Sequence, residues 1–198
     1  ETGDYTLDVG GDLTISNEGT LRPQGSTNHN VAGNWDDDGG TFEATEGTIT
    51  LSESIVGTGT TIKTKASNKF FNLTINSTES KEAITALDID GDFTILGGTF
   101  TNGLFTHNVA GNWDDAGGTF THSSGTIELS GSPQKTISTA ASNSFYNLTI
   151  AASGDVTTST IVDVDVANTF TVTAGGGAFT VAAGHKLTLL NATIGGTL

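Results

Sequence analysis

The chain is a succession of short runs in which apolar and polar residues alternate, separated by Gly, Asn, Asp or Ser. The runs at 13–15, 48–51 and 148–150 each carry an apolar residue at every second position. Alternation with a period of two predicts β-strands with one buried face, and the residues between the runs are typical of turns. No segment has the spacing of an amphipathic helix, so the pattern predicts an all-β protein.

The runs are organised into a long tandem repeat. Residues 29–42 (HNVAGNWDDDGGTF) and 107–120 (HNVAGNWDDAGGTF) differ at one position, at a spacing of 78. Segments 70–75 and 145–150 recur at a spacing of 75, and 7–15 resembles both 87–95 and 164–172. Repeats of this length are typical of stacked architectures. We therefore expect one continuous repeat domain over 1–198, with modules 4–83, 84–161 and a partial third module 162–198.

The number of runs in a module suggests how the chain winds. We count nine runs in the second module, which gives about 26 residues for every three strands, the size of one three-sided coil. The fold expected is a roughly triangular parallel β-solenoid, with apolar residues inside and threonines outside. Two immunoglobulin-like sandwiches of about 78 residues are the alternative, which the very short strands and the early end of the third copy disfavour.

Several motifs carry a family resemblance. GDLTI, GGTF, GTIEL and FYNLTI resemble the β-solenoid repeats of large secreted or surface-anchored bacterial and archaeal proteins. The resemblance covers nearly the whole chain and implies a parallel β-helix. Such repeats occur in adhesins, surface stalks and filaments, so it implies no single function.

Composition excludes several functional classes. The chain has 198 residues, 7 Lys plus Arg, 22 Asp plus Glu, a net charge of −15, 36 Thr, 27 Gly and no Cys or Met. So few cations in so acidic a chain argue against nucleic-acid binding, and no apolar run is long enough for membrane insertion. Disulfides and thiolate metal sites are excluded. The acidic, Cys-free and Met-free composition is typical of a processed, secreted protein, so we expect an extracellular or cell-surface location.

One segment has the chemistry of a cation site. Asp36, Asp37 and Asp38 precede a Gly pair, and the second copy keeps Asp114 and Asp115. Carboxylate oxygens are the ligands that Ca²⁺ prefers, so calcium is a possible cofactor at these aspartates. The alternative is a solvated turn, because consecutive residues point to different sides and no EF-hand spacing is present. We expect no other cofactor.

Other residues of the repeat have a structural and a functional interpretation. Trp35 and Trp113 are either sugar-stacking platforms or part of the core, and packing is the interpretation we favour. His29 and His107 recur without a second His nearby, which favours a structural role. Catalytic motifs such as G-x-S-x-G, a P-loop or H-E-x-x-H do not occur, and we expect no enzyme activity.

Two functional hypotheses remain. The first is a structural extracellular protein, a subunit or segment of a surface filament, sheath or stalk that assembles end to end, since no polar capping element is visible at either end of the solenoid. The second is an adhesin-type binding module that presents a solenoid face to glycans or to another cell. An adhesin should display an aromatic-lined groove on one side, whereas a structural subunit should interact through its ends.

Overall fold

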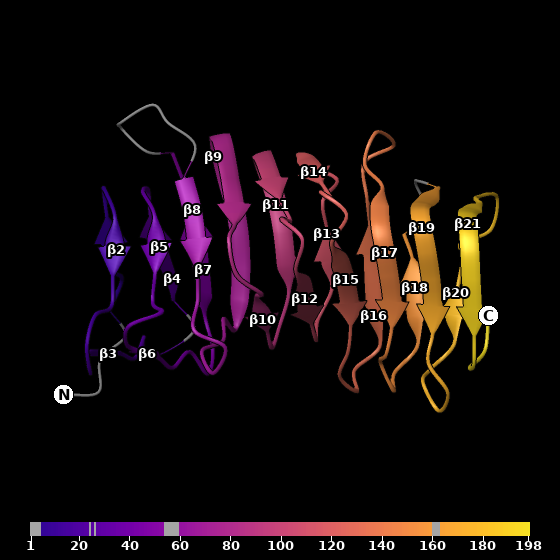
Figure 1. Ribbon diagram of the computed structural model, residues 1–198, viewed down its shortest axis with the longest axis horizontal. Helices are drawn as coiled ribbons and strands as arrows, with labels where there is room; N and C mark the ends of the chain where they lie inside the picture. The colour runs from indigo at the N-terminus through magenta and orange to yellow at the C-terminus, as the bar shows by residue number, and fades with distance from the viewer. Residues whose placement is uncertain (1–4, 24, 26, 54–59, 160–162) are drawn as a thin grey trace.

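A computed structural model describes residues 5–23, 25, 27–53, 60–159 and 163–198. The described residues form strands and turns without a helix, and all strand pairs are parallel. Paired residues on neighbouring coils lie about 21 positions apart, and the chain makes about eight turns. Figure 1 shows the strands stacked along the long axis, with the two termini at opposite ends. The expected parallel β-solenoid is therefore confirmed, with coils somewhat shorter than the 26 residues expected.

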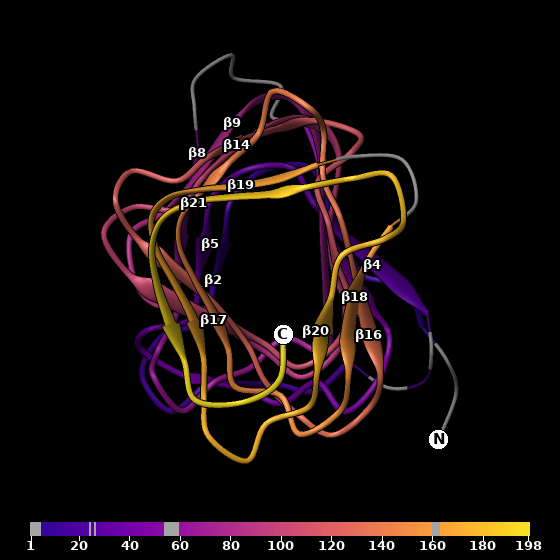
Figure 2. The same cartoon turned by 90° about the vertical axis from the view of Figure 1, so that its right-hand side faces the viewer.

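Each coil visits three faces in a fixed order, and we number the faces in the order in which the chain first meets them. Viewed down the axis, the backbone forms a ring around the core; β20 lies on the right, and β21 crosses the top and turns down the left (Figure 2). Face 1 contains β1 (Asp8–Val9), β4 (Asn28–Val31), β7 (Thr48–Leu51), the first parts of β9 (Asn72–Ala83) and β11 (Phe93–Thr101), β13 (Trp113–Asp114), β16 (Lys135–Ser138), β18 (Val156–Thr158) and β20 (Phe179–Thr180).

Faces 2 and 3 complete each coil. Four long strands, β9, β11, β19 and β21, bend round a corner and contribute to two faces each. The two parts of β9 and of β11 pair with different strands, and β19 and β21 pair with each other in two segments separated by a register shift. Face 2 contains β2 (Leu13–Thr14), β5 (Trp35–Asp36), β8 (Thr60–Lys63), the second parts of β9 and β11, β14 (Thr119–Thr121), Phe145 and the first parts of β19 (Val164–Val172) and β21 (Leu187–Ile194). Face 3 contains β3 (Thr20–Leu21), β6 (Thr41–Phe42), residues 69–70, β10 (Asp88–Ile89), β12 (Thr106–Val109), β15 (Thr126–Leu129), the rest of β17 (Phe145–Ile150) and the second parts of β19 and β21.

The module and the coil do not have the same period. From β1 to the end of β9 the chain occupies eleven strand positions, counting residues 69–70 and the two parts of β9, and the second module from β10 to β18 also occupies eleven. Eleven positions at three per coil make three and two-thirds coils, so a 78-residue module has about 21 residues per coil. Equivalent elements therefore move back by one face per module: β4 lies on face 1, whereas its counterpart β12 lies on face 3.

This rotation was not anticipated from the sequence. The pattern of apolar and polar residues predicts nine strands per module, and the two strand positions that it lacks are the segments around Trp113 and Phe145. Both are strand positions whose aromatic side chains are 1% exposed. Counting them gives eleven positions per module and shortens the coil.

The core is a continuous apolar column inside the ring. Alternation places one residue of each pair inward, so that β7 and β15 have the burial pattern of a strand with one covered face. Aromatic side chains stack from coil to coil; the Phe93 and Trp113 rings are 4.6 Å apart, and Trp113 also contacts Phe120 and Phe145. Parallel pairing and stacked apolar side chains together hold each coil to the next.

Candidate functional site

The five aspartates considered for calcium separate into two groups. Asp37 and Asp115 are 0% exposed and point into the core. The indole N–H of Trp35 donates to Asp37 Oδ2 (3.0 Å), and the backbone N–H of Lys65, on the following coil, donates to Oδ1 (2.9 Å). Burial raises the pKa of the Asp37 carboxyl, and these hydrogen bonds oppose the rise.

The second copy builds the same arrangement around Asp115. Trp113 Nε1 donates to Asp115 Oδ2 (2.9 Å), the backbone N–H of Ala140 donates to Oδ1 (3.0 Å), and Asn143 Nδ2 donates to the Asp115 carbonyl (3.1 Å). Burial raises the pKa of the Asp115 carboxyl as well. Both buried aspartates therefore tie a tryptophan of one coil to the backbone of the next, which is a structural role.

The other three aspartates lie at the surface. Asp38 contacts Lys63 Nζ (2.9 Å), Asp36 lies 3.9 Å from the same ammonium, and Asp114 accepts from the backbone N–H of Ala116 (3.1 Å). Within the part of the chain that the structure describes, no group of three or more His, Asp or Glu is placed to hold a metal. The fold thus does not bring the five residues together into one ligand set.

The tryptophans belong to the core. Trp35 and Trp113 are 0% and 1% exposed, so neither offers a ring face to a sugar. Each sits among Phe side chains; Trp35 lies 4.8 Å from Phe42 and 5.1 Å from Phe70 between ring centroids. The packing interpretation is therefore confirmed for both residues.

The repeated histidines join consecutive coils. His107 Nδ1 accepts from the backbone N–H of Leu87 (2.9 Å), while Nε2–H donates to the Asn102 carbonyl (2.8 Å), which fixes a neutral tautomer. His29 Nδ1 accepts from Leu7 N–H (3.0 Å) in the same way. Burial lowers the pKa of His107 to about 4 and also lowers that of His29. The expected structural role is confirmed.

Two buried lysines were missed by the sequence pattern. Lys81 is 0% exposed and Lys135 is 1% exposed. Lys81 Nζ donates to the Ala32 carbonyl (2.9 Å), and Lys135 Nζ donates to the Pro133 carbonyl (2.8 Å). Burial lowers the pKa of both ammonium groups. For Lys81, the one signal in the sequence is its place two residues before Ala83, on the inward side of β9.

One outward-facing residue of each coil lies directly above the next along face 3, and we call this column the face-3 ladder. Its members are charged near the first coil and are threonines near the last. Its first two pairs of opposite charges are Arg22 with Glu43 and Lys69 with Asp88, whose ammonium and carboxylate lie 3.0 Å apart. In these pairs a cation on one coil lies beside a carboxylate on the next, which is a favourable arrangement between neighbouring strands. From one end to the other the ladder runs Arg22, Glu43, Lys69, Asp88, Asn108, Glu128, Thr149, Thr171, Thr193.

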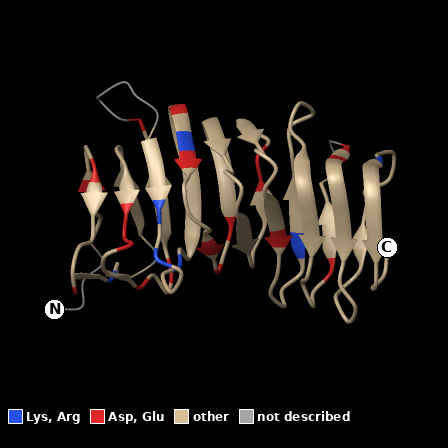
Figure 3. Ribbon diagram, viewed as in Figure 1, with Lys and Arg blue, Asp and Glu red and all other residues tan. Residues whose placement is uncertain are grey.

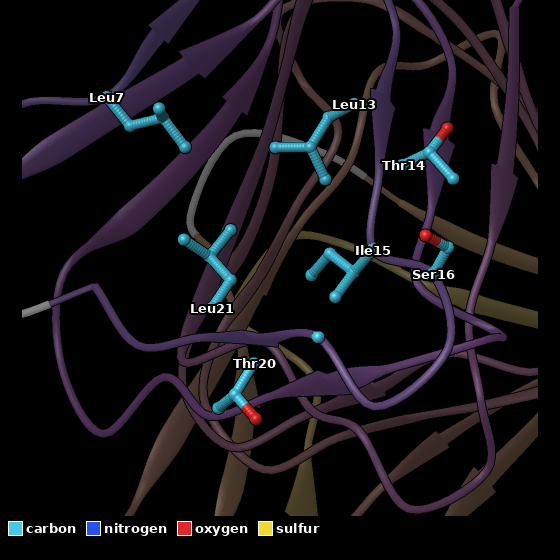
Figure 4. A pocket seen from close by; sticks show the side chains of 8 residues that line it. Leu7, Leu13, Thr14, Ile15, Ser16, Thr20 and Leu21 are labelled. Carbon is cyan, nitrogen blue, oxygen red and sulfur yellow. The ribbon is translucent and has the colours of Figure 1, made fainter.

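Among the described residues, no coil stacks on the outer side of the first coil, where Leu13 and Ile15 are 8% and 7% exposed. A cavity of about 370 Å³ lies at this end, and Leu7, Leu13, Ile15 and Leu21 project into it (Figure 4). Thr14, Ser16 and Thr20, which also lie around it, point away from its centre in the same view. We call these four apolar residues the first-coil mouth; another coil stacked there would cover them.

The last coil presents a long strand edge. β21 pairs with β19 on one side, and the described residues offer no strand on its other side. Leu190, Ile194 and Leu198 are 71%, 42% and 61% exposed. Natural edge strands are commonly protected by charge, proline or a bulge. β21 contains neither a charged residue nor a proline, although its pairing with β19 has one irregularity between Leu189 and Asn191. We call β21 with these exposed apolar residues the last-coil edge.

Comparison with protein-family models, curated proteins and solved structures gives no match. Functional inference therefore rests on the fold and on the described residues at its two ends. Among the described residues, no helix is long and apolar enough to cross a membrane.

Proposed function

We propose that the chain is a structural extracellular protein, a subunit or segment of a filament, sheath or stalk that assembles end to end. The observation that carries this proposal is the pair of open ends: the first-coil mouth with its apolar cavity, and the last-coil edge with its exposed leucines and isoleucine. Stacking one copy on another adds a coil to each end, which pairs the free strand edge and buries apolar surface.

The interior of the solenoid suits a load-bearing role. Histidines, asparagines and buried aspartates connect each coil to its neighbour through side chain–backbone hydrogen bonds. Such bonds run along the axis in addition to the strand pairs. An adhesin-type role gains no comparable support, because both tryptophans are buried.

Assembly can be tested with a matched pair of substitutions. Ile194 on β21 is 42% exposed and pairs with Val172, a core residue that is 1% exposed, whereas Leu104, on the side of the solenoid, is 79% exposed. We expect wild type to form linear assemblies in electron micrographs of concentrated protein. Ile194→Lys should abolish them, because a coil stacked on β21 would bury this charge in the core without a partner, whereas Leu104→Lys should assemble as wild type does. A wild-type chain that stays monomeric at high concentration contradicts the proposal.

A further inference from the structure

The two ends of the solenoid differ in charge. Within residues 5–23 the charged side chains are Asp8, Asp12, Glu18 and Arg22, so this end is acidic. Within 173–198, all of which the structure describes, the only Lys, Arg, Asp or Glu is Lys186. Figure 3 shows the same asymmetry, with acidic residues along the first half of the solenoid and none on β20 or β21. A joint between two first coils brings acids together, whereas a joint between a first and a last coil does not.

The pairing within the chain defines how another coil would stack. On face 3, Glu128 pairs with Thr149, Thr149 with Thr171, and Thr171 with Thr193, always at the same outward position. At the opposite end the same ladder finishes at Arg22, beside Glu43. Each face stacks on itself through the whole solenoid, because a rotated coil would lose the match between inward positions.

We propose that copies of this chain join head to tail without rotation, so that Thr193 of one copy lies beside Arg22 of the next. This inference rests on the end-to-end assembly proposed above and specifies its partner, polarity and register. At the joint the Arg22 guanidinium can donate to the Thr193 hydroxyl. One position earlier in the chain, Ala192 pairs with Phe170 and faces the core. In the joint, its small side chain lies opposite Leu21 of the first-coil mouth.

Cysteine cross-linking tests the register. The chain has no cysteine, so an Arg22→Cys/Thr193→Cys variant carries only the introduced pair. Adjacent strands lie about 4.8 Å apart, within the Cα separation that a disulfide spans. Under mild oxidation we expect a ladder of covalent dimers, trimers and longer species on a non-reducing gel. Two control pairs place the first cysteine on face 2 (Thr14→Cys/Thr193→Cys) or on face 1 (Asp8→Cys/Thr193→Cys). Each control should give at least tenfold less cross-linked product.

The outcomes separate the register from the function. If wild type assembles but a control pair cross-links as well as Arg22→Cys/Thr193→Cys, the joint is rotated and the register is wrong, while end-to-end assembly stands. If Thr193→Cys alone gives dimers as efficiently as the pair, the last coils meet each other and head-to-tail polarity is wrong. If wild type forms no linear assemblies, the proposed function and this inference both fail. All substituted positions lie on the surface, and circular dichroism of each variant verifies folding.

Discussion

Protonation of His107 should destabilise the solenoid at acidic pH. The ring is 1% exposed, accepts a hydrogen bond from Leu87 N–H through Nδ1 and donates through Nε2, so both nitrogens are already in use. Its pKa is about 4 in the folded chain, against an ordinary value of 6.5. The unfolded chain therefore takes up a proton at a pH where the folded chain does not, and stability falls as pH drops from 6.5 to 4.

The size of the effect follows from the difference in pKa. Each unit corresponds to about 1.4 kcal/mol, so the full difference of about 2.5 units corresponds to about 3.4 kcal/mol, fully expressed below pH 4. Between pH 7.5 and 5.0 the contribution of His107 to the free energy of unfolding should fall by about 2 kcal/mol. Asp37 and Asp115, whose raised pKa acts in the opposite direction, are present in every variant compared and cancel.

Urea unfolding followed by tryptophan fluorescence measures this loss. His107→Asn keeps an acceptor near the Nδ1 position but cannot be protonated in this range, so its unfolding free energy should fall by about 2 kcal/mol less than that of wild type between pH 7.5 and 5.0. The control is His122→Asn, at a more exposed turn position, which should keep the wild-type pH dependence. An equal loss in wild type and His107→Asn refutes the assignment of the acid sensitivity to the buried ring.

Three further substitutions test the packing of the coils. Gly98→Ala should lower the unfolding free energy by about 3 kcal/mol or more, because φ is +78° and a Cβ would lie 2.0 Å from the Ser77 carbonyl oxygen; Gly175→Ala, with φ +77° and open space, should lower it by about 1–2 kcal/mol. If both glycine variants lose the same unfolding free energy in urea, the close approach of Gly98 to the Ser77 carbonyl on the neighbouring coil does not contribute to the loss. Lys81→Met should raise the thermal unfolding midpoint and stabilise by about 1–3 kcal/mol, since it removes a buried ammonium whose pKa is lowered by burial. A drop in the midpoint would mean that the hydrogen bond to Ala32 outweighs the desolvation of the charge.

The alternation of apolar and polar residues was sufficient to predict the solenoid. Apolar residues between threonines, such as Phe100 and Phe120, are buried as the expected solenoid requires. The alternation did not predict the positions at which polar residues lie inside the core. Asp37 is buried because its partners, the Lys65 N–H and the Trp35 indole, come partly from a coil 28 residues further along. No local pattern reports contacts of that separation.

The rotation of the module was missed for a related reason. Trp113 is followed by Asp114 and Asp115 and preceded by Asn112, a composition that local rules assign to a turn. In the fold, Asn112 Oδ1 accepts from the Thr136 N–H of the next coil (2.8 Å), and the buried Asp115 carboxyl accepts a hydrogen bond from the Ala140 backbone N–H. The polar residues serve contacts between coils, so the segment is a strand despite its composition.

Cryo-electron microscopy of assembled protein tests end-to-end stacking most directly. The nine positions of the face-3 ladder make eight steps within one copy, and the joint adds a ninth, so steps of about 4.8 Å give an axial rise of roughly 43 Å per copy. We expect polar filaments with this rise, in which the strands of successive copies pair across each joint. Monomers at high concentration, or assemblies in which copies contact only through the sides of the solenoid, would contradict it.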